Sequence, residues 1–333
     1  MSAIPRSRRR LYAVLTLTLL AASAEGICRQ VWSVEDSALN PKLAHLTDHP
    51  TQLWTLHRGR TNDTTAEGMS LTTNRLGLRD DPITDPAPRT RILSMGGATT
   101  WGHGVAAEET YSQRLEARLL ADGHDAEVIN SGITAWSIWQ SYVFLAEQGR
   151  ALAPDAVMLY HLHSDSLPRG VRAPDSFLIE EAQTDRELYR RRHPYRHVLR
   201  LLYKSRAYLM LRRAVHGLPR SPPDTAPVTD GQPRVPRADR QVALAGIAAL
   251  CQSMGTALVV MMPVYQDHSG HDDTLTGFAQ STGAKYIDLA REKSDRGISD
   301  ADFFLDPLHP TAAGHAHIAD WIHTNIAEEP WIH

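Results

Sequence analysis

The stretch SMGGATTWGHG, residues 94–104, completes the apolar run RILSM of residues 91–95. A short apolar run that gives way at once to glycines and threonines is typical of a buried strand entering a tight turn. We therefore expect residues 91–95 to form a strand. The residues after it should form the first strand-to-helix turn of an α/β domain.

The chain beyond this turn alternates between strand and helix patterns. Apolar and β-branched runs predict strands at 91–95, 126–130, 156–160, 257–264 and 285–289. Segments 111–123 and 137–149 have apolar residues at helical spacing and end in glycine, which predicts helices between the strands. This alternation predicts an α/β fold with a mostly parallel sheet and helices on both faces. Ligands bind beyond the carboxyl ends of such strands, so the residues that follow each strand are the candidate site residues.

The N-terminal 30 residues have the pattern of an export segment. Arginines between residues 6 and 10 precede the apolar stretch 11–22, and Ala22-Ser23-Ala24 has the small-x-small pattern of a signal cleavage site. We therefore expect residues 1–30 to be either a cleaved signal peptide or a membrane anchor whose arginines stay in the cytoplasm. Both alternatives place the rest of the chain at the periplasmic or extracellular face.

Composition limits the remaining possibilities. The 333 residues are 42% apolar and 22% charged, with a formal net charge of -3, which predicts one main domain with attachments. The absence of a basic excess argues against a nucleic-acid partner. Cys28 and Cys251 do not indicate a disulfide framework, and Cys251 is expected in the core.

Residues 170–237 interrupt the alternation of strands and helices. The part from 174 to 218 is basic and helical in pattern, and residues 221–237 are rich in Pro, Asp and Gly. We expect a helical insertion followed by a surface loop. The basic helix is expected to be an amphipathic cap with a solvated face, the alternative being contact with anionic lipid or an acidic polymer.

The segment DPLHPTAAGHAHIADWI, residues 306–322, offers an acid and a base. Asp306 lies three residues before His309, and a helix is expected from about Thr311. A carboxylate this close to an imidazole can fix the ring tautomer and leave the other nitrogen as a base. The alternative is a helix-capping pair without chemistry.

Five segments, taken in order, resemble the SGNH (GDSL-type) hydrolase superfamily, particularly its exported bacterial branch. They are NRLGLR (74–79), GGATTWGHGVAAEETY (96–111), VINSGITAWS (128–137), PDAVMLYHLHSD (154–165) and DPLHPTAAG (306–314). The resemblance covers roughly residues 74–326 and implies a three-layer α/β/α fold with a flavodoxin-like sheet in residues 91–330, after a lead-in at 31–90. It also implies hydrolysis or transfer of acyl esters, often acetyl groups on carbohydrate, without a cofactor or a metal.

The same resemblance assigns roles to individual positions. It implies a nucleophile at position 98, an acid and base pair, and oxyanion donors. These fall respectively on Ala98; on Asp306 and His309; and on Gly132, Ser164 and the backbone N–H of residue 98. The candidate substrate contacts are Thr100, Trp101 and His163, which follow the first and third strands.

The chain departs from the family pattern at the attacking residue. Ala98 stands where the family has serine, and a methyl group cannot form an acyl-enzyme. Leu162 and Ser164 also replace the family's Gly and Asn, which favours natural divergence over an engineered knock-out. The sequence therefore predicts either a hydrolase-like protein without serine turnover or a binding module for an acylated carbohydrate or other small ester, serving polysaccharide acetylation. The oligomeric state is left open.

A minor alternative is a metal-dependent hydrolase. His161, His163 and Asp165 alternate along the sequence, and period-two spacing would place all three on one strand face. Further ligands are not evident downstream.

Overall fold

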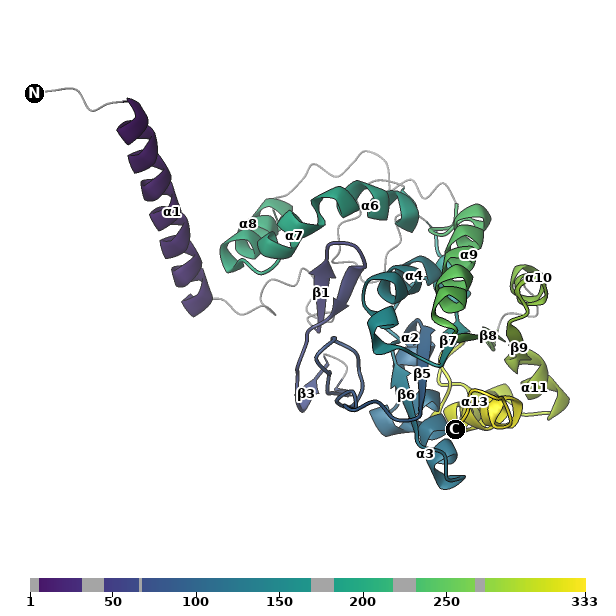
Figure 1. The fold of residues 1–333 in the computed structure, drawn as a ribbon. Helices are drawn as coiled ribbons and strands as arrows, with labels where there is room; N and C mark the ends of the chain where they lie inside the picture. The colour runs from purple at the N-terminus through teal and green to yellow at the C-terminus, as the bar shows by residue number, and fades with distance from the viewer. Residues whose placement is uncertain (1–5, 32–44, 66–67, 169–182, 218–231, 267–272) are drawn as a thin grey trace, which may run out of the picture.

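A computed structural model of the chain describes residues 6–31, 45–65, 68–168, 183–217, 232–266 and 273–333. Its centre is a five-stranded sheet in the order β6-β5-β7-β8-β9, with every neighbouring pair parallel (Figure 1). The strands are β5 (Thr90–Gly96), β6 (Ala126–Asn130), β7 (Ala156–Tyr160), β8 (Ala257–Met262) and β9 (Lys285–Asp288). The predicted α/β fold with a flavodoxin-like parallel sheet is confirmed.

Helices cover both faces of the sheet, giving three layers (Figure 1). One face carries α3 (Tyr111–Ala121), α11 (Leu289–Asp295), α12 (Asp300–Phe303) and α13 (Ala312–Ile326). The other carries α4 (Ile138–Glu147), α9 (Arg237–Met254) and α10 (Asp273–Thr282). Successive side chains of β5 point to opposite faces of the sheet, as the two-residue period of a strand requires. Ile92 belongs to the first core, on the face of α3 and α13, and Leu93 to the second core, on the face of α4 and α9. Cys251 is buried in α9, as expected, and Cys28 and Cys251 are both free thiols.

The strand order places a potential binding site between β5 and β7. These strands are neighbours, but the chain leaves β5 toward β6 on one side and later returns to β7 on the other. The connections therefore diverge at the carboxyl ends of β5 and β7, and that divergence opens a crevice in doubly wound sheets.

The lead-in before β5 packs into the second core. It contains two antiparallel hairpins, β1 (Leu46–His49) with β2 (Leu53–Leu56), and β3 (Asp63–Thr64) with β4 (Ser70–Leu71). The indole N–H of Trp54 donates to the carbonyl of Thr134 (3.1 Å), and the indole N–H of Trp136 donates to the carbonyl of Trp54 (2.9 Å). These reciprocal bonds join the hairpin to the loop after β6.

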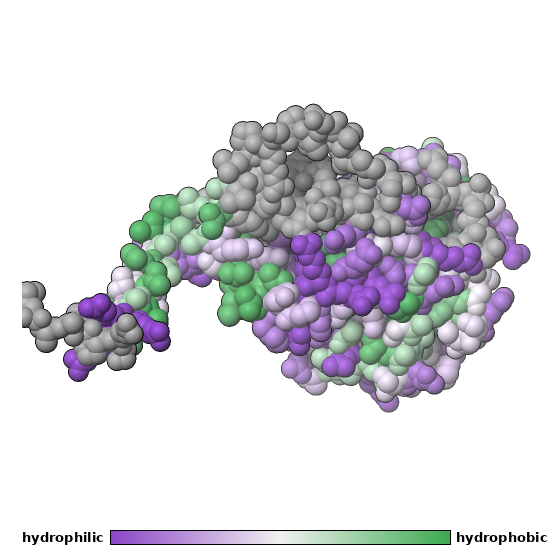
Figure 2. Space-filling model, turned by 90° about the horizontal axis from the view of Figure 1, so that it is seen from above, coloured by the Kyte–Doolittle hydropathy of each residue, from purple (hydrophilic) through white to green (hydrophobic). Residues whose placement is uncertain are grey.

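Helix α1 (Arg6–Val31) protrudes from the domain. Residues 8–31 are long and apolar enough to cross a membrane, with a mean hydropathy of 1.7 over the best window, none of which is buried. Figure 2 shows apolar side chains along this helix and hydrophilic ones at its far end. A signal sequence has the same properties, so both alternatives for the export segment are compatible with the helix.

The described part of the insertion is helical. It contains α6 (Asp185–Arg192), α7 (Arg196–Leu202) and α8 (Arg206–Gly217), while 170–182 and 218–231 lie outside the described residues. The carboxylate of Glu25 in α1 accepts hydrogen bonds from the Ser205 hydroxyl (2.7 Å) and the N–H groups of Arg206 (3.0 Å) and Ala207 (3.1 Å). The end of α1 therefore caps the start of α8. The remaining short elements are α2 (Ala98–Trp101), α5 (His163–Ser166) and the 3-10 helices at Ala107–Glu109, Gly149–Leu152 and His193–Tyr195.

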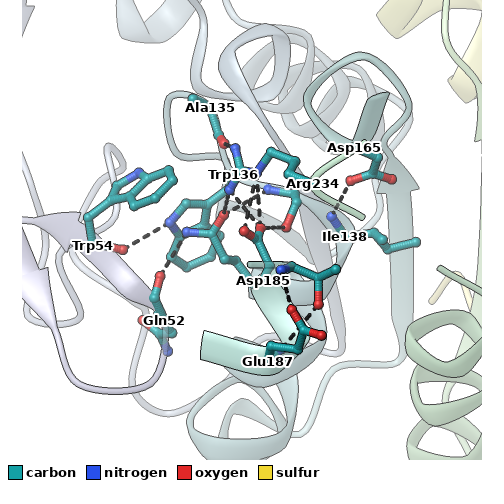
Figure 3. Close-up of polar contacts among 12 residues, drawn as sticks. Gln52, Trp54, Ala135, Trp136, Ile138, Asp165, Asp185, Glu187 and Arg234 are labelled. Carbon is teal, nitrogen blue, oxygen red and sulfur yellow. Dashed lines mark hydrogen bonds and ion pairs between the residues drawn. The ribbon is translucent and has the colours of Figure 1, made fainter. Parts of the chain in front are cut away.

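A buried ion pair closes the base of this insertion (Figure 3). The side chains of Arg234 and Asp185 are both fully buried, with a guanidinium nitrogen 2.6 Å from a carboxylate oxygen. Arg234 also donates to the carbonyl of Ala135 (2.9 Å) and the side chain of Gln140 (2.9 Å), and Ser137 donates to Asp185 (2.7 Å). The two ends of the insertion are thereby fixed to the loop that leads into α4.

Replacing Arg234 by Met should destabilise the fold strongly, because Asp185 would remain buried without its counter-charge. We expect a loss of about 3–5 kcal/mol in the free energy of unfolding, measured by urea denaturation. The matched control is Arg291→Met, which breaks the exposed pair of Arg291 with Asp295 and should cost less than about 1 kcal/mol. Equal losses in the two variants would contradict this role for Arg234.

Candidate functional site

A cavity opens at the carboxyl ends of β5 and β7, where the strand order predicts it. Its walls come from the turn after β5, the segment after β7, the loop after β8 and the loop before α13. The lining residues are Gly97, Ala98, Thr99, Tyr160, His161, Leu162, His163, Ser164, Tyr265, Leu308 and His309. The candidate nucleophile position and the candidate base therefore face one cavity, although they are far apart in the sequence.

Glycines fix the path of the turn after β5. A Cβ at Gly96 would lie 1.9 Å from the Thr100 hydroxyl oxygen, and a Cβ at Gly132 would lie 2.3 Å from the backbone nitrogen of Trp101. Helix α2 therefore packs directly against both glycine backbones. Since Ala98 is the first residue of α2, its N–H has no acceptor within the helix.

Arg79 holds the other end of α2. Its buried guanidinium donates to the carbonyls of Trp101 (3.0 Å), Gly102 (2.8 Å) and Val105 (2.8 Å) and lies 4.7 Å from the Trp101 ring centroid. The carbonyls at a helix end need partners that the helix cannot supply. Arg79 supplies them, and so acts as a positioning residue for the turn that carries Ala98.

Asp306 and His309 form the predicted hydrogen-bonded pair. Nδ1 of His309 lies 2.7 Å from Oδ2 of Asp306, while Oδ1 accepts the N–H groups of Leu308 (2.8 Å) and His309 (2.9 Å). Partial burial raises the pKa of Asp306, but these hydrogen bonds outweigh it and hold the pKa below its usual value. A carboxylate at Nδ1 leaves Nε2 with the lone pair, which is the arrangement of a general base.

The candidate oxyanion donors are in different environments. Ser164 lines the cavity, with its hydroxyl oxygen 3.3 Å from the position of a Cβ on Gly97. Gly132 is not a lining residue, and its N–H donates to Oδ1 of Asn130 (3.0 Å). Of the residues expected to supply oxyanion donors, Ala98 and Ser164 therefore line the cavity and Gly132 does not.

Two of the three candidate substrate contacts lie outside the cavity. Thr100 is fully buried, and its hydroxyl is 2.8 Å from that of Tyr111. Trp101 is only 2% exposed and packs beside Arg79. Only His163 of this set lines the cavity.

The expected placement of His161, His163 and Asp165 on one strand face is wrong. Strand β7 ends at Tyr160 and α5 begins at His163, so the period of two is broken within the set. Nε2 of His161 is 2.8 Å from the Ser141 hydroxyl, and Asp165 accepts the N–H of Ile138 (2.8 Å). Two of the three proposed metal ligands are therefore engaged in packing α4 against the sheet.

Burial explains the electrostatics of these two residues. Burial, with the nearby charges of Arg240 and Arg234, lowers the pKa of His161 to about 3. Burial also raises the pKa of Asp165 to about 6, against the opposing effect of Arg240. Both shifts are those of groups removed from water.

His103 is a site residue that sequence reasoning missed. It follows α2 directly, and its ring centroid lies 4.4 Å from that of His309. The sequence offered one indication of this role, which is that His103 lies in the WGHG segment shortly after Ala98. Only the fold brings that segment beside residue 309.

No family model matches the chain, and no curated protein matches it. Among solved structures, the chain is similar to the psychrotrophic esterase EstA from Pseudoalteromonas sp., with a TM-score of 0.45 and 13% identity over 72% of this chain and 97% of that one. It is also similar to Axe2, an acetylxylan esterase from Geobacillus stearothermophilus, with a TM-score of 0.47 and 15% identity over 73% of this chain and 96% of that one. These likenesses concern the fold alone.

The low pKa of His161 predicts a pH dependence of stability. Between pH 6.5 and about pH 3 the unfolded chain binds a proton at this site that the folded chain does not, so stability falls as the pH falls through this window. His161→Gln keeps an amide for Ser141 but cannot titrate. We expect its unfolding free energy to vary less steeply with pH near pH 5, by about 1.4 kcal/mol per pH unit.

The measurement is urea denaturation of both proteins at several pH values between 4.5 and 6. His197→Gln, at an exposed position on α7, is the matched control and should keep the original slope. A slope unchanged by His161→Gln would show that the folded protein accepts the proton at this site.

Proposed function

We propose that this chain is an SGNH-type protein of the cell envelope that binds small acyl esters and has lost serine-based turnover. One observation carries the proposal. The hydrogen-bonded pair of Asp306 and His309 lies on the same cavity as Ala98, at the carboxyl ends of β5 and β7. The family resemblance of the motifs supplies the chemical class.

The site retains the proton-transfer half of acyl transfer. In a serine hydrolase the imidazole takes the hydroxyl proton and the carboxylate orients the ring and stabilises its cation. His309 and Asp306 are arranged for these two tasks. At Ala98 there is no hydroxyl to deprotonate, and loss of the nucleophile from such a set costs about 10⁶-fold in turnover.

The lining of the cavity suits an ester with a small acyl group. Leu162 and Leu308 contribute apolar surface, while Ser164 and the N–H of Ala98 are hydrogen-bond donors for a carbonyl oxygen. An acylated carbohydrate is the ligand class that the resemblance implies. Binding without turnover fits a role in polysaccharide acetylation.

We further propose that α1 anchors the domain at the membrane. The apolar part of α1 lies outside the folded core, and arginines flank its start. At its other end, Glu25 is bonded to the first turn of α8. The anchor would thus hold the domain through a structured joint at the outer face of the membrane.

Restoring the hydroxyl tests the proposed chemistry. Ala98→Ser should raise hydrolysis of a chromogenic acetyl ester by about 10³–10⁴-fold, because the restored nucleophile is worth about 10⁶ and imperfect oxyanion donors cost about 10²–10³. The assay compares the initial rates of the two proteins. The double variant Ala98→Ser with His309→Ala is the control and should lose the gain.

Two outcomes would overturn the proposed roles of His309 and Ala98. A silent Ala98→Ser protein that still folds would show that the pair is not poised to act as a base. Activity of the unaltered chain that His309→Ala abolishes would show that turnover proceeds without a residue 98 hydroxyl.

Membrane retention tests the proposed anchor. The full chain should stay in the membrane fraction after alkaline carbonate extraction, whereas a chain lacking residues 2–24, exported behind an unrelated signal peptide, should be released. N-terminal sequencing of the extracted protein is the decisive check. A chain that begins at Glu25 would identify residues 1–24 as a cleaved signal instead.

A further inference from the structure

We infer that α7 and α8 form an amphipathic surface that lies on the outer leaflet of the membrane and binds anionic lipid headgroups. Its apolar part, called here the apolar face of the insertion, consists of the exposed side chains of Tyr195, Val198, Leu201, Met210 and Leu211. The inference rests on the proposed anchoring by α1. It adds a second contact with the same membrane, which the anchor alone does not require.

The apolar face of the insertion is exposed although it belongs to folded helices. Leu201 is 72% exposed, Leu211 63% and Val198 57%, whereas Leu209 of α8 is buried. Tyr195, Val198 and Leu201 are three residues apart, so they lie along one side of the helical segment 193–202. The short segment 203–205 joins α7 to α8. Exposed apolar side chains gathered on neighbouring helices mark a surface that binds a partner or a membrane.

The charge of this segment favours a lipid partner. Residues 193–211 contain no aspartate or glutamate and four basic residues, which are Arg196, Arg200, Lys204 and Arg206. An amphipathic helix binds an anionic bilayer with its apolar side between the headgroups and acyl chains, while its cations stay with the headgroups. An acidic polysaccharide would engage the cations but leave the apolar face in water. A bilayer accounts for both features.

Three contacts hold α8 against the end of α1. Glu25 caps the first turn of α8, as described above. The guanidinium of Arg29 donates to the carbonyl of Lys204 (3.2 Å), and Sγ of Cys28 lies 3.7 Å from Sδ of Met210. Figure 1 shows α8 and α7 on the side of the domain nearest α1. The apolar face of the insertion is therefore attached beside the helix proposed to span the membrane.

The contacts also place α8 at the depth of the bilayer surface. A membrane-spanning helix needs about 20 residues, so a span that begins at Leu11 ends near Val31. At a rise of about 1.5 Å per residue, Glu25 and Arg29 lie about 9 and 3 Å from that end. Amphipathic helices lie about 5–10 Å into the boundary between headgroups and acyl chains. A helix packed on residues 25–29 is thus level with this boundary.

The two attachments differ in what they depend on. Insertion of α1 depends on its apolar length, whereas binding by α7 and α8 also depends on the negative charge of the lipid surface. A single span leaves the domain able to tilt and swivel on the membrane. The second contact restrains both movements, so the orientation of the domain follows the anionic lipid content of the leaflet.

Fluorescence quenching by lipid tests the contact in the full chain. Leu201→Cys and Leu211→Cys, each made with Cys28→Ser and Cys251→Ala, are labelled with an environment-sensitive fluorophore. The proteins are reconstituted into vesicles of equal parts phosphatidylcholine and phosphatidylglycerol that contain a lipid with a nitroxide near the top of its acyl chain. We expect quenching of at least about half of the fluorescence at both positions, because a side chain about 5–10 Å into the boundary lies beside the nitroxide.

The matched control is the same label at Leu120→Cys. Leu120 is 51% exposed on α3, which lies at the opposite end of the domain from α8 (Figure 1). Its fluorescence should be quenched only slightly. Protein that floats with the vesicles but shows no more quenching at positions 201 and 211 than at position 120 would overturn the inference.

Charge reversal tests the preference for anionic lipid. Lys204→Glu should lower the quenching at position 211, as should vesicles of phosphatidylcholine alone, because each removes the attraction between cation and headgroup. Arg291→Glu, at an exposed position on α11, is the matched reversal and should leave the quenching unchanged. Quenching that neither change lowers would contradict binding of anionic headgroups. Quenching that a soluble acidic polysaccharide abolishes would assign the surface to that polymer and overturn the inference.

Flotation of the vesicles separates this inference from the proposed anchor. A full chain that does not float with them would overturn the anchor and the lipid contact together. A chain that floats without quenching at positions 201 and 211 would overturn the lipid contact alone. The proposed ester chemistry is tested independently by Ala98→Ser, since the cavity is not part of α7 or α8.

Discussion

The close packing of α2 against Gly96 and Gly132 is the constraint on which the site depends. A side chain at either glycine would collide with α2, by the distances of 1.9 and 2.3 Å given above. Because α2 cannot move away without losing the Arg79 bonds at its far end, residue 98 is fixed over the ends of β5 and β7. The position of Ala98 therefore follows from backbone packing and is independent of its own side chain.

The same packing explains which polar groups are available for chemistry. The side chain of Asn130 donates to the carbonyl of Thr100 and accepts the N–H of Gly132, so it ties β6 to α2. The Thr100 hydroxyl is likewise engaged with Tyr111 behind the turn. Thr100, a candidate substrate contact, is thus used here to hold the turn together. Ser164, the N–H of Ala98 and His309 remain at the cavity.

Sequence periodicity predicted the fold because the sheet strands are short and apolar, and because the helical segments 111–123 and 137–149 between them end in glycine. The pair of Asp306 and His309 was also predictable, since the two residues are three positions apart and local geometry decides their contact. The ion pair of Arg234 and Asp185 was not, because it closes an insertion whose ends meet only in the folded chain. His103 was missed for the same reason. The predicted strand-face position of His161 was wrong because β7 ends at Tyr160, one residue before it.

Retention of the acid and base pair does not require retention of turnover. The Asp306 carboxylate contacts the imidazole of His309 and also accepts hydrogen bonds from the backbone N–H groups of Leu308 and His309. These backbone bonds shape the loop before α13 whether or not a proton is ever transferred. None of these bonds involves residue 98, so they do not depend on which side chain stands there. The imidazole of His309, which lines the cavity, is therefore oriented independently of the side chain at residue 98.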